Sequence, residues 1–532
     1  MKRAKLLVLP AVAGLLVPLL AGCGSSGGKD GSQDPIVMGS TDSIGTLDPA
    51  GAYDIGSWTL FTNTFQTLLR YPNDGSEPQP EAASKCVFTS QNSTSYRCTV
   101  RDGLKFSNGH ALTASDVKFS IQRTIKIESG FGPSSLFGNL DRIETPDDKT
   151  VVFMLKQADA TFPFVLATPA AAIVDEESYP ANKLSTDDGI AGSGPYALSS
   201  LQRSGGRHHR LLKAEFTGNA NYEGSIHAKN SKFEVRYFPD STQMQQALEK
   251  KDIDLTHRTL TPKQITQLGG EEDRGIKVTE APGSEIRYLV FNTKDASVQN
   301  VAVRQAMAHL IDRKALVRDV YKRTAEPLFS MIPKGIPGHI NAFYNAYGEP
   351  DRDKARTALQ KANVSTPVSL TLSYTSDHYG SATADEFAVI KRQLERSGLF
   401  KVQLQGKQWE DFQAGYNKRK FQVFGMGWYP DFPDPDNYIA PFVGRKNFLK
   451  SPYQNGDILN NLLPDSRRQA ERSAVVDDFT KVQEILANDV PLLPLWQGRQ
   501  YIAHRDNING VQWTLDASST FRFWELEKGS GS

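Results

Sequence analysis

The chain has little of several features that would point to a class of function. Its 532 residues include three cysteines, and 61 Lys and Arg residues are balanced by 60 Asp and Glu residues, which leaves a formal net charge of +1. A chain this balanced lacks the bulk electrostatic attraction that draws proteins to nucleic acid or to acidic lipid. Beyond the N-terminal segment, no apolar run reaches the roughly 20 residues of a membrane-spanning helix. We therefore expect no nucleic-acid partner and no membrane-spanning segment in the main body.

Motifs for catalysis and for cofactors are missing as well. From residue 36 onward the chain has no Gly-x-Ser-x-Gly elbow, no His-Glu-x-x-His pair and no phosphate-binding loop. The nine histidines are scattered, and the adjacent pair His208 and His209 lies in an arginine-rich stretch that indicates an exposed loop. A formal dinucleotide fingerprint at 22–27 follows no strand and precedes no helix, so it is accidental. We expect no enzyme, no cofactor and no metal site.

The N-terminus has the order of a secretory signal. Three basic residues among the first five precede an apolar stretch at 6–20, which Pro10 and Pro18 interrupt. Such a charged-then-apolar order is typical of export signals, and the stretch is too short for an ordinary spanning helix. We expect residues 1–22 to be a signal peptide.

The end of this segment, Leu20-Ala-Gly-Cys23, resembles the bacterial lipobox. The resemblance implies cleavage before Cys23 and lipidation of that residue, which would hold the protein by acyl chains on the extracytoplasmic face of the cell membrane. The alternative is an ordinary cleaved signal with an incidental cysteine. Residues 23–34 are rich in Gly and Ser and are expected to form a flexible tether.

With Cys23 lipidated, Cys86 and Cys98 remain as a pair in an oxidising compartment. The residues between them indicate a strand, a polar turn and a strand. A disulfide across this hairpin would stabilise the fold by about 2–3 kcal/mol. The alternative is two separate buried thiols.

Helix and strand signals alternate along the body. Capping boxes at 113–116 and 261–264 predict helix starts, and apolar spacing over 303–311 predicts one buried helix face. Apolar runs at 150–155, 287–291 and 368–374 indicate strands. The mixture predicts an α/β protein.

Several segments, in sequence order, resemble those of the bacterial extracellular solute-binding proteins of family 5, the peptide- and nickel-binding components of ABC importers. The most specific are Tyr96–Val117, with Arg101-Asp-Gly-Leu-Lys-Phe-Ser-Asn-Gly109, and the block Gly427-Trp-Tyr-Pro-Asp-Phe-Pro-Asp-Pro-Asp-Asn-Tyr438. Shorter matches lie at 46–49, 192–196, 221–224, 246–248, 252–255, 291–294 and 303–306. Together these segments cover most of the chain beyond the tether.

The resemblance implies an α/β, two-lobed periplasmic-binding-protein-like fold of the large, three-subdomain class II type, with ligand in a hinged cleft. Lobe I is expected to hold residues 35–283 and 490–528, and lobe II residues 284–489. The Pro- and Gly-containing segment 281–284 suits the first crossing between lobes, and 491–496 suits the second.

The resemblance also assigns residues to the cleft. In peptide-binding members an aspartate of the Gly-Trp block pairs with the ligand's α-ammonium, and Asp431 matches it. An ammonium enclosed between lobes loses its water, so it needs a fixed anion. The alternative is a solvated aspartate of a turn. Asp434 and Asp436 are expected to shape the loop.

Aromatic residues match other ligand-lining positions of the family. Trp428 and Trp409 match positions that line the pocket of oligopeptide binders, where flat rings give contact area at little entropic cost. The alternative for both is core packing. Tyr53 and Ile55 match a segment that runs beside the ligand backbone.

One departure concerns the ligand's carboxylate. Peptide binders of this family often use arginines in the segment before the Gly-Trp block, where this chain has Tyr416 and Gly425. The carboxylate is therefore met from elsewhere, or the ligand is longer, blocked or not a peptide. Arg304, at a helix start, is expected to be structural.

These observations lead to one functional hypothesis. We expect a monomeric, lipid-anchored substrate-binding protein that captures di- or oligopeptides outside the cell and delivers them to an ABC permease and ATPase complex. The alternatives are a receptor for a nickel chelate or an oligosaccharide on the same fold, and a signalling lipoprotein without transport.

Overall fold

The computed structural model describes residues 34–73, 75, 77–186, 188–205, 210–445, 447–515 and 521–529. The predicted signal peptide, Cys23, nearly all of the predicted tether and the pair His208 and His209 lie outside the described residues. No helix in the described part of the chain has the length and apolar character needed to cross a membrane.

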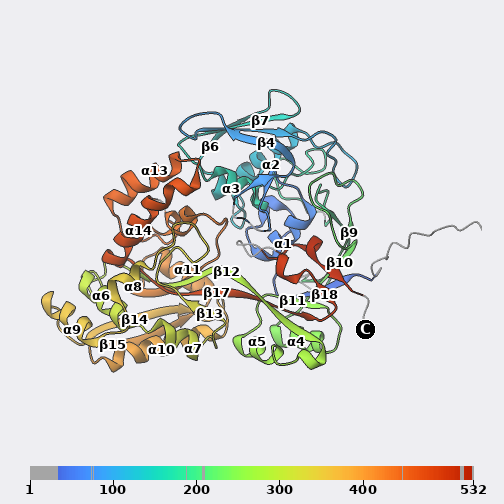
Figure 1. Cartoon of the computed structure of the whole chain (residues 1–532). Helices are drawn as coiled ribbons and strands as arrows, with labels where there is room; N and C mark the ends of the chain where they lie inside the picture. The colour runs from blue at the N-terminus through green and yellow to red at the C-terminus, as the bar shows by residue number, and fades with distance from the viewer. Residues whose placement is uncertain are drawn as a thin grey trace, which may run out of the picture.

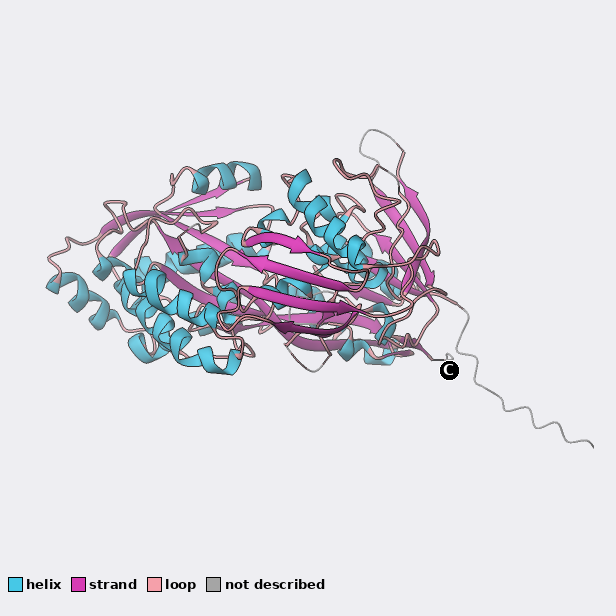
Figure 2. Ribbon diagram, turned by 90° about the horizontal axis from the view of Figure 1, so that it is seen from above, coloured by secondary structure: helices cyan, strands magenta, loops and turns pink. Residues whose placement is uncertain are grey.

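One long mixed sheet runs through the molecule (Figures 1 and 2). Its strands pair in the order β15-β14-β16-β12-β17-β11-β1-β10-β9-β8, and β13 pairs with β17. The strands are β1 (Ile36–Ser40), β8 (Tyr196–Arg203), β9 (Leu211–Gly218), β10 (Lys232–Tyr237), β11 (Leu255–His257), β12 (Ile276–Phe291), β13 (Ala325–Pro327), β14 (Val368–Thr375), β15 (Phe400–Lys407), β16 (Val423–Trp428) and β17 (Leu492–Arg505). The predicted strands at 287–291 and 368–374 are confirmed within β12 and β14.

The strands β12 and β17 cross from one half of the molecule to the other (Figure 1). They are antiparallel, and their register shifts between Pro282 and Ile286. At this point the backbones lie so close that a Cβ on Gly283 would stand 2.3 Å from the carbonyl oxygen of Gly498. This close approach requires glycine at position 283. The register shift between β12 and β17 lies where the two strands pass from one lobe to the other.

A second sheet forms a separate subdomain at the top of Figure 1. Its order is β4-β5-β7-β6, with β4 (Ala83–Phe88), β5 (Ser95–Val100), β6 (Leu140–Glu144) and β7 (Thr150–Leu155). The strand predicted at 150–155 is confirmed as β7. Cys86 and Cys98 lie opposite each other in the β4–β5 register and form a disulfide. The bond joins two strands of the hairpin that begins this subdomain.

Helices cover both faces of the long sheet (Figure 2). Capping boxes are present at the starts of α2 and α5, and α6 carries the predicted buried face, so these three predictions are confirmed. The helices are α1 (Ile55–Thr64), α2 (Ala114–Ile127), α3 (Phe162–Leu166), α4 (Ser241–Glu249), α5 (Pro262–Leu268), α6 (Val301–Leu310), α7 (Arg313–Asp319), α8 (Ala342–Tyr347), α9 (Arg352–Lys361), α10 (Ala382–Arg396), α11 (Trp409–Asn417), α12 (Ala440–Val443), α13 (Leu463–Arg468) and α14 (Val476–Asp489). The remaining strands are the short pairs β2 (Leu69–Arg70) with β3 (Gln79–Pro80) and β18 (Ile508–Asn509) with β19 (Glu527–Lys528).

Buried apolar side chains form groups that follow the two lobes. One large group draws on residues 36–255 and again on 502–526, and it also includes Phe432 of the Gly-Trp block. Two others draw on residues 286–496. The chain therefore builds one core from its beginning and its end, and a second core from its middle.

Arg304 is structural, as expected. Its side chain is buried and donates to the carbonyl oxygens of Asp489 and Val490, at the C-terminal end of α14, and to those of Val298 and Gln299. The guanidinium thereby ties the start of α6 to the end of α14.

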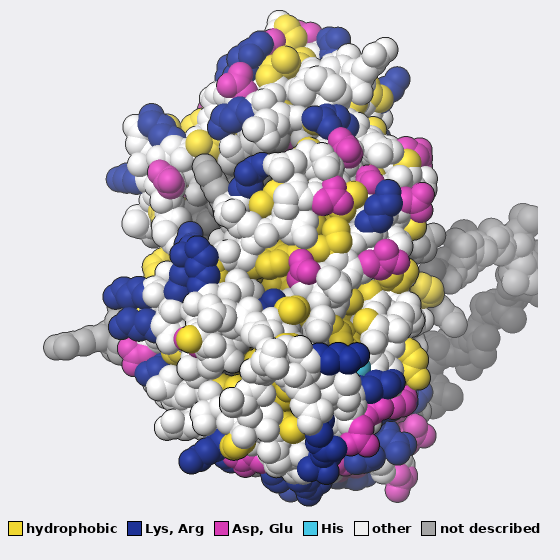
Figure 3. Space-filling model, turned by 90° about the vertical axis from the view of Figure 1, so that its left-hand side faces the viewer, with side chains coloured by type: hydrophobic (Ala, Val, Ile, Leu, Met, Phe, Trp, Pro, Cys, Tyr) yellow, Lys and Arg dark blue, Asp and Glu magenta, His cyan; other side chains and the backbone are white. Residues whose placement is uncertain are grey.

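The surface carries both signs of charge. Lys and Arg lie among Asp and Glu on the face shown in Figure 3, together with hydrophobic side chains near its middle. This interspersion agrees with the near-zero net charge of the sequence.

Candidate functional site

A cavity of about 430 Å³ lies where the two lobes meet the crossing strands. Lobe I contributes the segment after β11, including Arg258, and lobe II contributes Tyr379 and Tyr429. The crossing strands contribute Arg287 and Trp496. The cavity is therefore an aromatic, charged cleft between lobes, of a size that suits a small organic ligand.

Arg287 forms the floor of this cavity on β12. Its guanidinium carbon lies 4.1 Å from the ring centre of Tyr379, 5.2 Å from that of Trp496 and 5.8 Å from that of Tyr429, and it forms an ion pair with Glu285. A Cβ at residue 427 would stand 1.9 Å from Arg287 Nη1, so Gly427 leaves the room that the guanidinium occupies. The glycine of the Gly-Trp block is thus required by this arginine.

Histidines of the cavity wall are neutral near pH 7. His257 is buried, neither ring nitrogen has a hydrogen-bond partner in the described part of the chain, and Asp42 is 3.8 Å from Nδ1. Burial lowers the pKa of His257 to about 4. Burial, and then the positive charge of Arg287, lower the pKa of His378 to about 4 as well. Neither imidazole adds charge to the cavity at physiological pH.

Asp431 is buried at the interface between the lobes, with 7% of its surface exposed. One oxygen accepts a hydrogen bond from the hydroxyl of Tyr53, which comes from lobe I, and the other accepts from Asn437 Nδ2 at 3.0 Å. Burial raises the pKa of Asp431, and the hydrogen bonds from Asn437 and Tyr53 act in the opposite direction. No Lys, Arg or His of the described residues forms an ion pair with this carboxylate. Its charge is met by neutral donors alone.

The other two aspartates of the same loop have arginine partners. Arg472 holds Asp434 through two bonds of 2.7 and 2.8 Å, and Arg467 holds Asp436 through two bonds of 2.8 Å. Asp434 also accepts from the backbone N–H of Asp436. These contacts agree with the expectation that both carboxylates shape the loop.

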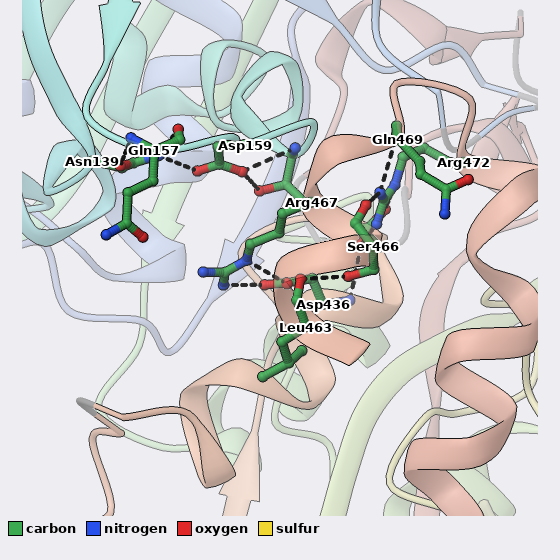
Figure 4. Close-up of polar contacts among 11 residues, drawn as sticks. Asn139, Gln157, Asp159, Asp436, Leu463, Ser466, Arg467, Gln469 and Arg472 are labelled. Carbon is green, nitrogen blue, oxygen red and sulfur yellow. Dashed lines mark hydrogen bonds and ion pairs between the residues drawn. The ribbon is translucent and has the colours of Figure 1, made fainter. Parts of the chain in front are cut away.

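The same arginine segment meets the small-sheet subdomain (Figure 4). The backbone N–H of Ala160 donates to the carbonyl oxygen of Arg467 at 2.8 Å, and Ser93 Oγ donates to that of Arg468 at 3.1 Å. Asp159 lies beside Arg467 and accepts from Asn139. The helix α13 therefore connects the Gly-Trp loop to lobe I.

None of the five residues predicted to bind ligand lines the 430 Å³ cavity. Four of them are close to a lining residue in the chain, stack on one, or bind another of the five. Trp428 and Asp431 flank Tyr429, which lines it. Trp409 stacks on His378, also a lining residue, with ring centres 3.7 Å apart. Tyr53 contacts Asp431.

Trp428 and Ile55 have structural roles as well. The indole of Trp428 stacks on Phe448, with ring centres 5.2 Å apart, and its Nε1 donates to Asn437 Oδ1 at 3.2 Å. Ile55 is the half-buried first residue of α1, whose start is capped by Asp54. Trp428 thus fixes the asparagine that also binds Asp431.

Five cleft residues were not predicted from the sequence: Arg258, Arg287, His257, Tyr379 and Trp496. Arg287 had a signal, because a charged residue at the start of the apolar run 287–291, within β12, needs a partner or a function. Tyr429 lies inside the Gly-Trp block and could have been named from it. Arg258 lies in a loop without a motif, so only the fold places it.

Residues 77–450 match the family described as bacterial extracellular solute-binding proteins, family 5 Middle. The match covers well over half of the chain. The chain belongs to this family. Members of family 5 are extracytoplasmic solute-binding proteins and not enzymes.

Relatives of this family 5 protein match along nearly their whole length. The probable D,D-dipeptide-binding periplasmic protein DdpA of Escherichia coli is 26% identical over 508 residues, 93% of this chain and 95% of that protein. The dipeptide-binding protein DppE of Bacillus subtilis is 23% identical over 548 residues, 96% and 97% of the two chains. The structure of DppA from Helicobacter pylori with the peptide STSA has a TM-score of 0.76 and 21% identity, and covers 93% of this chain and 98% of that one. The fold is therefore the two-lobed α/β fold that the sequence resemblance implied.

Two positions of this family 5 chain cannot supply a ligand-binding arginine. Tyr416 is buried and packs its ring parallel to that of Phe424, with centres 6.0 Å apart. At Gly425 a Cβ would stand 2.3 Å from Phe387 Cζ. Side chains at both positions face the core of lobe II. A ligand carboxylate must be met by other residues.

In the described part of the chain, no group of three or more His, Cys, Asp or Glu side chains could hold a metal ion. Of the aspartates in the Gly-Trp block, Asp434 and Asp436 bind arginines, and Asp431 accepts hydrogen bonds from neutral groups.

Proposed function

We propose that this protein is the substrate-binding component of an ABC importer and that it captures peptides in the interlobe cleft. The observation that carries the proposal is the state of Asp431. It is a buried carboxylate between lobes, and it has hydrogen bonds from neutral groups but no cation. A ligand ammonium would supply the missing positive charge.

The energetics favour this role over a purely structural one. A buried anion is costly unless it is paired, and two of the three aspartates in this loop are paired with arginines. A charge-assisted hydrogen bond from an α-ammonium contributes about 1.5–3 kcal/mol. Trp428 precedes the cavity-lining Tyr429 in the chain, and Trp409 stacks on the cavity-lining His378; both tryptophans are proposed to bound the space for ligand side chains. Tyr53 and Ile55 are proposed to lie beside the ligand backbone.

The names of several relatives support a peptide as ligand. DdpA and DppE are named for dipeptides, and the DppA structure holds a peptide. The aromatic walls of the cleft here suit a ligand whose side chains vary, because flat rings pack against many shapes.

Delivery requires the lobes to move. We propose lobe I as residues 35–283 with 490–528, and lobe II as 284–489, as expected from the sequence. The cores suggest one refinement, because side chains from Leu492 to Trp496 pack in lobe II and Ile502 packs in lobe I. The second crossing then lies near Gln497. Ligand that contacts both lobes would favour their closure, which a permease can recognise.

We also propose that the protein acts at the outer face of the cell membrane, anchored through lipidated Cys23. The lipobox resemblance supports this location, and family members are extracytoplasmic. A monomer suffices for the proposed cycle of capture and delivery.

The direct test replaces the anion and keeps its shape. Asp431→Asn should lower the affinity for a free-amine peptide at least tenfold, about 1.4 kcal/mol, while N-acetylated peptides should bind the native protein poorly. Isothermal titration calorimetry with both peptide forms measures the two effects.

Asp465→Asn is the matched control, since that aspartate pairs with Arg468 on the surface. Equal affinity of the Asp431→Asn variant for a free-amine peptide would remove Asp431 from the role. Thermal stabilisation by nickel with histidine or by an oligosaccharide, and not by peptides, would replace the peptide with another solute.

A further inference from the structure

Arg258 is a cation of the cavity without a hydrogen-bonded anion. It follows β11, and its side chain is 23% exposed. Its guanidinium carbon lies 5.1 Å from the ring centre of Tyr429. The nearest carboxylate, Asp42, is 4.0 Å from Nε, and no hydrogen bond from the guanidinium to another described residue is present. This cavity-lining guanidinium therefore has N–H donors that no described residue uses.

The other arginines of the cavity differ from Arg258. Arg287 is paired with Glu285, and Arg499 is paired with both Glu280 and Glu326, the latter at 2.8 Å. Both are already neutralised by protein carboxylates. Arg258 is the lining arginine, in the described part of the chain, whose hydrogen-bonding capacity is left for something else.

The backbone at Arg258 is held in an unusual conformation. Arg258 and Thr259 have φ angles of 61° and 59°, in the left-handed region that residues other than glycine rarely occupy. The hydroxyls of Thr259 and Thr41 form a hydrogen bond that fixes the loop. Strain of this kind persists where surrounding structure imposes it, and it concentrates at ligand sites. Here it accompanies an arginine at the wall of the cavity.

We propose that Arg258 binds a carboxylate of the solute. This inference rests on the proposed function and refines it: the ligand is a short peptide with a free C-terminus, held at Asp431 by its ammonium and at Arg258 by its carboxylate. Tyr429 links the two groups: its ring centre lies 5.1 Å from the guanidinium carbon of Arg258, and it precedes Asp431 by two residues in the chain. A cation–π contact with this ring uses no N–H donor, so the guanidinium keeps its donors for a two-point contact with a carboxylate.

Arg258 would supply the contact to a ligand carboxylate that Tyr416 and Gly425 cannot make. Neither position faces the cleft, so an arginine from lobe I takes the role across the cavity. Because Arg258 belongs to lobe I and Asp431 to lobe II, a ligand bound to both would join the lobes through its own two charges.

The test compares free acids with amides. A dipeptide and a tripeptide pool, each as free acid and as C-terminal amide, and the dicarboxylic acids succinate and glutarate are titrated calorimetrically into the full-length protein. The native protein should prefer peptide acids over amides at least tenfold. Arg258→Gln should abolish that preference by weakening acid binding tenfold or more, with amide binding unchanged, and Arg258→Lys should fall between.

Arg318→Gln is the matched control and should retain the preference, because Arg318 is exposed outside the cavity and pairs with Asp319. Circular dichroism and melting temperature report whether each variant is folded, and the lysine variant supplies the comparison if the glutamine variant is not. Equal binding of acids and amides by the native protein, or unchanged acid binding by the Arg258 variants, would overturn the inference while leaving the peptide proposal standing.

The remaining outcomes separate the two proposals. Binding of a dicarboxylic acid but of no peptide, with loss in Arg258→Gln, would keep Arg258 as the carboxylate site and overturn the peptide function. Binding of neither class would overturn both.

Discussion

Three aspartates within six residues of one loop are buried, and their negative charges are stabilised in two different ways. Asp434 and Asp436 are each held by two bonds from an arginine. Asp431 is held by a tyrosine hydroxyl and an asparagine amide. The first arrangement neutralises the charge within the protein, and the second leaves a net negative charge in place. The comparison separates the carboxylates that are paired with arginines from the one that we propose binds a ligand ammonium.

The largest expected loss of stability comes from removing the arginine of a buried ion pair. Arg472→Leu leaves Asp434 charged and buried, which should lower the free energy of unfolding by about 3–5 kcal/mol in urea denaturation. Arg468→Leu removes an exposed ion pair with Asp465 and should cost at most about 1 kcal/mol. Similar losses in the two variants would mean that the buried pair has no special role.

A loss of stability of intermediate size is expected when the Tyr53 hydroxyl, which donates a hydrogen bond to Asp431, is removed. Tyr53→Phe removes one hydrogen bond to an ionised group, worth about 1.5–3 kcal/mol, so stability at pH 7 should fall by up to this amount. The loss should be much smaller in an Asp431→Asn background, as measured by a double-mutant cycle. An equal loss in both backgrounds would show that the hydroxyl stabilises something other than the carboxylate.

The smallest effect is expected at Asp431 itself, and it should depend on pH. Asp431→Asn should change the free energy of unfolding at pH 7 by less than about 1 kcal/mol, because the lost hydrogen bonds are offset by removal of a buried charge. Burial raises the folded-state pKa above the ordinary value of 3.8, so the native protein carries a penalty that grows as pH rises from 3.8 through the raised pKa.

Lowering the pH from 7 to 3 removes that penalty from the native protein alone. The stability of the variant relative to the native protein should therefore fall over this range, as followed by urea denaturation at each pH. A relative stability that rises as pH is lowered would show that the folded state favours the ionised carboxylate of Asp431.

Much of the architecture was accessible from the sequence. Capping boxes and apolar periodicity gave the starts of α2 and α5 and the buried face of α6, because these signals depend on neighbours within a few residues. The ordered family segments implied the two-lobed α/β fold. The division of the long sheet was less accessible, since β17 begins in one lobe and ends in the other without a break in its pattern.

The cleft was predicted only in outline. Asp431 was identified through its block, but its lack of a cation became visible only when Arg467 and Arg472 were found beside Asp436 and Asp434. Arg258 was missed because its place in the cavity depends on the contact of lobe I with Tyr429 of lobe II. Such pairings join residues more than 150 positions apart, and no local pattern encodes them.

The way the first core is assembled has a consequence for folding. Phe233 on β10 stacks against Phe523 with ring centres 3.8 Å apart, and Asn63 of α1 donates to the carbonyl oxygen of Phe521. The strand β11 pairs with both β1 and β17. Lobe I therefore cannot complete its core until the last 30 or so residues have been synthesised, although lobe II needs only the middle of the chain. The lobe whose first residues are synthesised earliest is therefore the last to complete its core.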